Sequence, residues 1–161
     1  MQKDILKPDY LFEISWEVCN KIGGIHTVLT SKLNSLKDIS RHIFIGPDLV
    51  KEDEFNPEFI EDKQIMKTWR NIVQSEGLGI RIGRWNIEGK PLVILVDFSQ
   101  FISKKDEIFK KYWELYQLDS ISGEWVYIES TLFGYAAGKV IESFVKFNCT
   151  HTDNVTAHFH E

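Results

Sequence analysis

A lysine and two glycines near the start of the chain have the types and spacing of an anion site: Lys21, Gly23 and Gly24. Free N–H groups at a helix start, beside a glycine that allows close approach, favour a diphosphate or another anion, and a lysine adds a point charge. The spacing fits neither GxGxxG nor the Walker loop, which argues against NAD and ATP. An ordinary tight turn with an exposed lysine stays open as the alternative.

Two histidines and a glutamate form a second candidate site at His158-Phe159-His160-Glu161. Alternation along a strand sends His158 and His160 to the same side. These side chains are good zinc ligands, but a third reliable ligand is not identifiable, and Cys149 is a poor candidate. A histidine also suits contact with a sugar, or general acid and base catalysis near neutral pH. A histidine satisfied within the edge of a sheet is the third interpretation, and the residues alone favour it.

Hydrophobic periodicity predicts the elements that must position these two segments. Strands are expected at 10–16, 41–45, 78–86, 92–97 and 155–159, and helices at 25–36, 59–74, 104–118 and 124–147. The run LVILVD at 92–97 is typical of a buried central strand, and the charged stretch 49–77 is expected at the surface. The alternation indicates an α/β fold with a doubly wound, mainly parallel sheet. Ligands bind outside the carboxyl ends of such strands, where Gly23 and His160 fall.

Length and composition indicate one domain and exclude several partners. A chain of 161 residues is the size of one ordinary α/β domain. Its net charge of −5, with the signs interspersed, argues against a nucleic-acid partner. Two distant cysteines, an N-terminus without a signal-peptide core and the absence of a long apolar run predict a cytoplasmic protein that does not span a membrane. A last strand without a covering helix indicates a chain cut from a longer protein.

Five segments in order resemble the eukaryotic-type glycogen synthases, which are retaining glycosyltransferases related to the starch synthases. LFEISWEVCNKIGGIHTVLTSK resembles the family's opening strand, basic residue, paired glycines and first helix. RHIFIGP resembles the second strand, and GIRIGRWNIEGKPLVILVDF is the most specific match. TLFGYAAG and VTAHFHE follow in the expected order, although the tryptophan that follows the final glutamate in the family lies beyond this sequence.

The resemblance implies that residues 1–161 form the N-terminal Rossmann-like domain of a GT-B glycosyltransferase, without the C-terminal donor-binding domain. Lys21, Gly23 and Gly24 would face the diphosphate of UDP-glucose, and His160 would contact the transferring glucose as a catalytic and donor-binding residue. The implied reaction moves glucose to the non-reducing end of an α-1,4-glucan such as glycogen, with no metal and no cofactor. This chain alone would be inactive.

Two other functions stay open, and so does the oligomeric state. The donor of the full-length protein could be ADP-glucose in place of UDP-glucose. The chain could instead be a non-catalytic module that binds nucleotide or glucan. A homo-oligomer of the full-length protein is compatible with the sequence.

Overall fold

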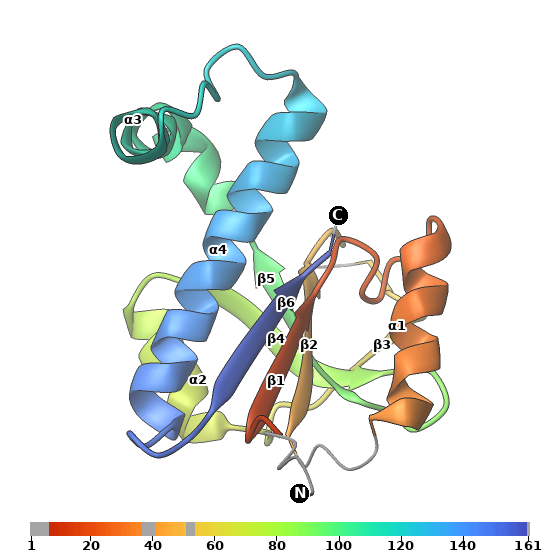
Figure 1. Ribbon diagram of the computed structural model, residues 1–161. Helices are drawn as coiled ribbons and strands as arrows, with labels where there is room; N and C mark the ends of the chain where they lie inside the picture. Colours follow the sequence, from red (N-terminus) through yellow and green to blue (C-terminus); the bar gives the residue numbers. More distant parts are fainter. Residues whose placement is uncertain (1–6, 37–40, 51–53, 161) are drawn as a thin grey trace, which may run out of the picture.

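The chain folds around one six-stranded sheet with helices on both faces (Figure 1). The computed structural model describes residues 7–36, 41–50 and 54–160, and the strand order is β3-β4-β5-β2-β1-β6. The strands are β1 (Tyr10–Ile14), β2 (His42–Pro47), β3 (Phe59–Glu61), β4 (Gly79–Trp85), β5 (Leu92–Asp97) and β6 (Val155–Phe159). The helices are α1 (Gly24–Ser35), α2 (Lys67–Ser75), the 3-10 helix η1 (Ser99–Lys104), α3 (Lys105–Tyr116) and α4 (Trp125–Asn148).

Four parallel neighbours, β5, β2, β1 and β6, form the part of the sheet that carries the candidate site. All of β1 is buried, and Ile14 near its end aligns with Ile45 of β2 and Phe159 of β6. The first strand is shorter than the predicted 10–16, because a turn begins at Ser15, whose carbonyl accepts the N–H of Val18. LVILVD lies between β2 and β4 and is buried from Val93 to Val96, so the predicted central strand is confirmed.

The remaining two strands run antiparallel at the far edge of the sheet. A short connection joins β4 to β5 and includes Gly89 at φ 81°, a left-handed conformation that glycine adopts without strain. The predicted helix 59–74 is wrong at its start, since Phe59 to Glu61 pair with β4. The carboxylate of Asp62 accepts the N–H of Gln64 in a turn, and helix α2 begins only at Lys67. The sheet is therefore mainly parallel, as predicted, with an antiparallel margin.

Each face of the sheet has its own core. Helices α2 and α4 cover one face, while α1 covers the other around Leu29, Phe44 and Trp85. The expectation that 49–77 lies at the surface is wrong for α2, because Trp69 and Val73 are buried. The indole N–H of Trp69 donates to the hydroxyl of Ser143 in α4, at 3.2 Å, which ties α2 to the long helix.

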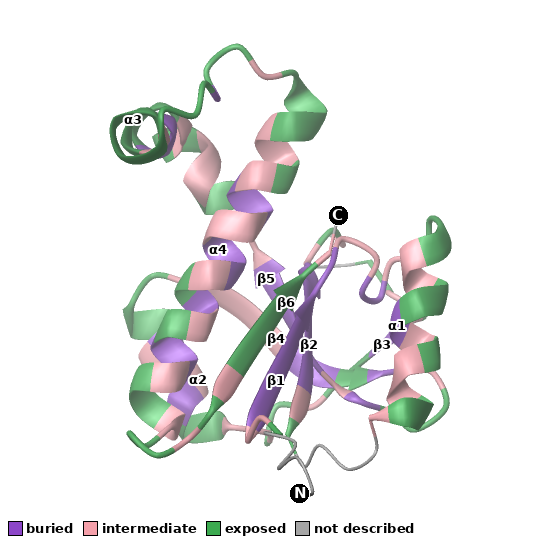
Figure 2. Ribbon diagram, in the orientation of Figure 1, coloured by how far each residue is buried: buried purple, intermediate pink, exposed green. Residues whose placement is uncertain are grey.

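The edge strand β6 and the upper part of the molecule are much more exposed than the central strands (Figure 2). Helix α3 and the first turns of α4 project beyond the sheet (Figure 1). Trp113, Tyr116 and Val126 on this projection are at least half exposed. Within the described part of the chain, no helix is both long and apolar enough to cross a membrane.

Candidate functional site

Both segments singled out in the sequence lie beyond the carboxyl ends of the parallel strands. The turn with Lys21, Gly23 and Gly24 follows β1, and His160 follows β6, which is the neighbour of β1. The backbone N–H of His160 donates to the carbonyl of Ile14 at 2.8 Å. The fold therefore places the two predicted segments at one edge of the sheet.

At the glycine turn, an acidic side chain occupies the predicted anion-binding groups. One carboxylate oxygen of Glu17 accepts the N–H of Gly23 at 2.8 Å and the N–H of His26 at 3.0 Å. Burial raises the pKa of Glu17, but the backbone hydrogen bonds outweigh it and hold the pKa below its usual value. The expectation of free N–H groups is thus wrong for these two donors, because the chain supplies its own anion to the start of α1. Gly24 is exposed, and the position that a Cβ would take there is open as far as the described residues are concerned.

A second carboxylate ties the glycine turn to the sheet. Glu58 accepts the backbone N–H of Lys21 at 3.1 Å and the indole N–H of Trp85 at 3.2 Å. The same carboxylate lies 3.3 Å from Nε2 of His26. Lys21 itself is exposed. The turn is therefore held by its backbone, which leaves the lysine at the surface.

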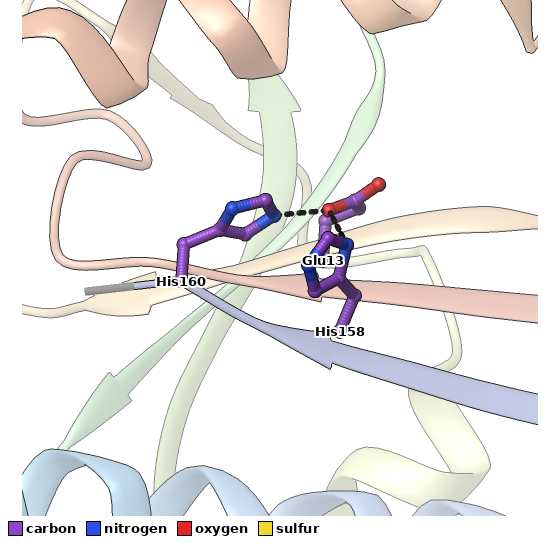
Figure 3. A group of neighbouring side chains, drawn as sticks. All are labelled: Glu13, His158 and His160. Atoms are coloured by element: carbon purple, nitrogen blue, oxygen red, sulfur yellow. Dashed lines mark hydrogen bonds and ion pairs between the residues drawn. The ribbon is translucent and has the colours of Figure 1, made fainter.

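Beside the turn, four side chains from three elements form what we call the terminal cluster: Glu13 of β1, Lys32 of α1, and His158 and His160 at β6. Figure 3 shows Glu13 with the two histidines. Nε2 of His160 makes a short hydrogen bond with Oε2 of Glu13. Nζ of Lys32 donates to the other oxygen, Oε1, at 2.8 Å. Nζ also lies 3.2 Å from Nδ1 of His158, whose ring is 4.1 Å from that of His160. The sequence prediction that the two histidines share a side is confirmed.

The carboxylate of Glu13 is the centre of this cluster, and its side chain is only 1% exposed. Burial alone would raise the pKa of Glu13, but hydrogen bonds from His160 and Lys32 outweigh it and keep the pKa below its usual value. The group is therefore a buried carboxylate anion. His42 on β2 lies 3.8 Å from Oε1 of Glu13, and burial lowers its pKa although Glu13 opposes the shift.

The terminal cluster has three groups that metals bind. Ligand atoms of Glu13, His158 and His160 all lie within 4.8 Å of one another. The ammonium group of Lys32, however, already contacts both Glu13 and His158. A divalent cation would have to displace this charge or lie beside it, which is unfavourable in a buried position. The oxygen and nitrogen atoms of this cluster are thus arranged around the ammonium group of Lys32, and they suit it better than a metal ion.

A cavity of about 300 Å³ lies next to His160, between the ends of β1 and β6 and the helix α4. Its lining consists of Ile14, Trp16, Tyr127, Ser130, Thr131, Phe133, Gly134, Phe159 and His160. Two larger hollows, of about 400 and 560 Å³, lie elsewhere and include none of the predicted site residues. The smaller cavity is the candidate ligand site, because it alone of these three adjoins the carboxyl ends of β1 and β6.

The sequence interpretation missed the acidic residues and the lysine that hold both segments in place: Glu13, Glu17, Glu58 and Lys32. The one available signal for Glu13 was an acidic residue inside the apolar run LFEI. Because parallel strands are buried on both faces, a carboxylate within one must find partners. Which partners it finds depends on the fold, since Lys32 and His160 lie 19 and 147 residues away in sequence.

The doubly wound fold, with its candidate site at the ends of parallel strands, defines a Rossmann-like α/β domain. The family model described as glycogen synthase matches residues 13–161. The chain therefore belongs to the glycogen synthase family, and the resemblance recognised in the sequence is confirmed.

Curated relatives agree over nearly the whole chain. The glycogen (starch) synthase of Dictyostelium discoideum is 32% identical over 155 residues, which cover 94% of this chain and 17% of the relative. The corresponding protein of Caenorhabditis elegans is 31% identical, with 94% and 23% covered. Isoform 2 of Saccharomyces cerevisiae is 29% identical over all of this chain and 24% of its own length. The chain thus spans about a fifth of the length of these relatives.

Proposed function

We propose that this chain is the N-terminal domain of a GT-B glycogen synthase, whose full-length form transfers glucose from UDP-glucose to the non-reducing end of an α-1,4-glucan with retention of configuration. Family membership supports the proposal. The observation that links the proposal to particular residues is that the glycine turn and His160 both lie at the carboxyl ends of the neighbouring strands β1 and β6. Donor nucleotides in open α/β sheets bind at such strand ends.

Each predicted site residue has a role in this proposal. Lys21 stabilises the departing diphosphate as an exposed cation, and Gly23 and Gly24 allow the backbone to approach it. His160 contacts the transferring glucose. The carboxylate of Glu17 moves off the N–H groups of Gly23 and His26 when the diphosphate uses them, because one donor cannot serve two anions at full strength.

The proposal also covers what lies outside these residues. A C-terminal domain supplies most of the donor site, so residues 1–161 alone do not synthesise glucan. The reaction uses neither a metal nor a cofactor, and nucleic acid and membranes are not partners. We place the full-length protein in the cytoplasm, with assembly into a homo-oligomer left to measurement.

The test is incorporation of glucose into glycogen by the full-length protein, with UDP-glucose and ADP-glucose supplied separately. We expect incorporation from UDP-glucose. Incorporation from ADP-glucose alone would correct the donor and leave the reaction in place. No incorporation from either donor, together with retained binding of nucleotide or glucan, would replace the enzyme with a non-catalytic binding module.

The substitution His160→Ala assigns the role of that residue in the same assay. We expect turnover to fall much more than the KM for the donor changes, because positioning matters most in the transition state. A loss of stability with unchanged turnover would show that His160 only supports the sheet edge.

A further inference from the structure

We propose that Glu13 is a positioning residue for His160: its buried carboxylate holds the imidazole ring in one orientation and leaves Nδ1 as the atom that faces the sugar. The inference rests on the proposed contact between His160 and the transferring glucose. Glu13 lies at the end of β1 and does not need to touch the substrate to act in this way.

The hydrogen bonds define where the hydrogen of the imidazole lies. A carboxylate anion only accepts hydrogen bonds, so Nε2 of His160 must donate to Oε2 of Glu13. In a neutral ring Nδ1 is then the acceptor, and it makes no hydrogen bond to another residue that the structure describes. Figure 3 shows Nδ1 on the part of the ring turned away from Glu13. An acceptor of this kind suits a sugar hydroxyl.

Lys32 keeps the carboxylate of Glu13 in place. Its ammonium group donates to Oε1, so Oε2 is left for His160. Lysine only donates, which makes Nδ1 of His158 the acceptor of its second contact. His158 therefore directs no hydrogen from Nδ1 toward Oε2, although the two atoms lie 3.5 Å apart. The two hydrogen-bond donors thus use different oxygens of Glu13: Lys32 binds Oε1 and His160 binds Oε2.

Burial and a second anchor make the orientation rigid. The side chains of Glu13 and His160 are 1% and 8% exposed, so water competes little for their hydrogen bond. The backbone N–H of His160 is bound to Ile14 on the same strand as Glu13. Main chain and ring are thus both fixed to β1. A small displacement of a reacting geometry can cost about 100-fold in rate, which makes such fixation useful.

The experiment compares variants of the full-length protein in glucose transfer from UDP-glucose. For Glu13→Gln, whose amide cannot replace a carboxylate between two cationic or donor groups, we expect kcat to fall roughly 10- to 100-fold. The KM for the donor should change less than about threefold, since ground-state binding by other groups remains. Asp48→Asn is the matched control: this half-buried carboxylate pairs with Arg81 at 3.2 Å and does not contact His160. We expect its kcat to stay unchanged.

A double-mutant cycle separates positioning from simple support. In a His160→Ala background, Glu13→Gln should cost almost no further activity, because its effect acts through the imidazole. Additive losses would overturn the inference and leave the proposed function standing, whereas absence of transfer by the unmodified protein would overturn both. Loss of transfer on chelation, restored by zinc, would show that the cluster holds a metal instead. If Glu13→Gln is not stably folded, Glu13→Gln/Lys32→Gln removes both charges and gives the same comparison.

Discussion

The terminal cluster and the glycine turn each contain a glutamate from the same short stretch of chain, yet the two carboxylates are held in different ways. Glu13 is buried, and its partners are side chains from α1 and β6. Glu17 is half-buried, and backbone N–H groups within nine residues of it are its partners. The first arrangement depends on the complete sheet, whereas the second can form from a local segment. Substitutions should therefore affect the cluster more than the turn.

The largest expected effect is on stability when the centre of the cluster is removed. Glu13→Ala leaves Lys32 without its buried partner, and we expect a loss of about 3 kcal/mol in the free energy of unfolding. Urea denaturation followed by tryptophan fluorescence measures it. Lys32→Ala is the control and should cost less, because a third of the Lys32 side chain is exposed and Glu13 keeps His160. Equal costs for Glu13→Ala and Glu17→Ala would remove the distinction between the two regions.

The pH dependence of stability should also depend on His42, which lies beside the terminal cluster. Burial lowers the pKa of His42, so the folded state keeps the imidazole neutral while the unfolded state takes up a proton below its usual pKa of 6.5. Stability must therefore fall as the pH drops from 6.5 toward the folded pKa, by at most about 1.4 kcal/mol per pH unit. His42→Leu should flatten the curve of unfolding free energy against pH in this range. If His42→Leu leaves the slope of unfolding free energy against pH unchanged, His42 is not the group that causes the loss of stability.

At the glycine turn, we expect substitution of Lys21 to change the use of the donor but not the stability of the fold. Lys21→Ala should lower kcat/KM for UDP-glucose roughly tenfold, as removal of one charge-assisted contact of about 1.4 kcal/mol to the departing diphosphate does. Stability should not change, because Lys21 is exposed. Steady-state kinetics of the full-length protein and urea denaturation test the two halves. A kcat/KM equal to that of the unmodified protein would show that Lys21 does not act on the donor.

A smaller effect of opposite sign is expected from the carboxylate that occupies the turn. Glu17→Gln weakens the cap of α1, which typically costs about 1 kcal/mol of stability. It also removes an anion that competes with the diphosphate for two N–H groups. Inhibition by UDP should therefore become a few times stronger. Weaker inhibition would show that Glu17 assists donor binding.

The smallest effect is expected from the second glycine of the turn. Gly24 begins α1, and among the described residues, its chain neighbours and the helix backbone aside, a Cβ there would meet no atom within 4 Å. Gly24→Ala should stabilise the chain by less than about 1 kcal/mol, because alanine loses less backbone entropy in a helix. At Gly23 a Cβ would lie 3.1 Å from the carboxylate of Glu17, so Gly23→Ala should disturb the turn. Comparison of the two variants by urea denaturation tests whether only one glycine is required by the fold.

The sequence predicted those parts of the molecule whose signals are local. The strands 92–97 and 155–159 are predicted with the observed bounds, because LVILVD is an apolar run and VTAHF alternates apolar and polar residues, two patterns typical of strands. The strand Phe59–Glu61 was missed, since three residues are too few to show a period of two. The role of Glu13 could not be predicted, because its partners come from α1 and from the end of the chain. The roles given to Lys21, Gly23, Gly24 and His160 stay predictions.

The long helix α4 runs without interruption through 24 residues, a length of about 36 Å. Its later turns are anchored in the core by Leu132, Val140 and Phe144, while its first turns extend with α3 beyond the sheet. The projection is therefore joined to the core through a continuous helix. The same helix lines the cavity beside His160 with residues 127–134, so the projection and this cavity share one unbroken element.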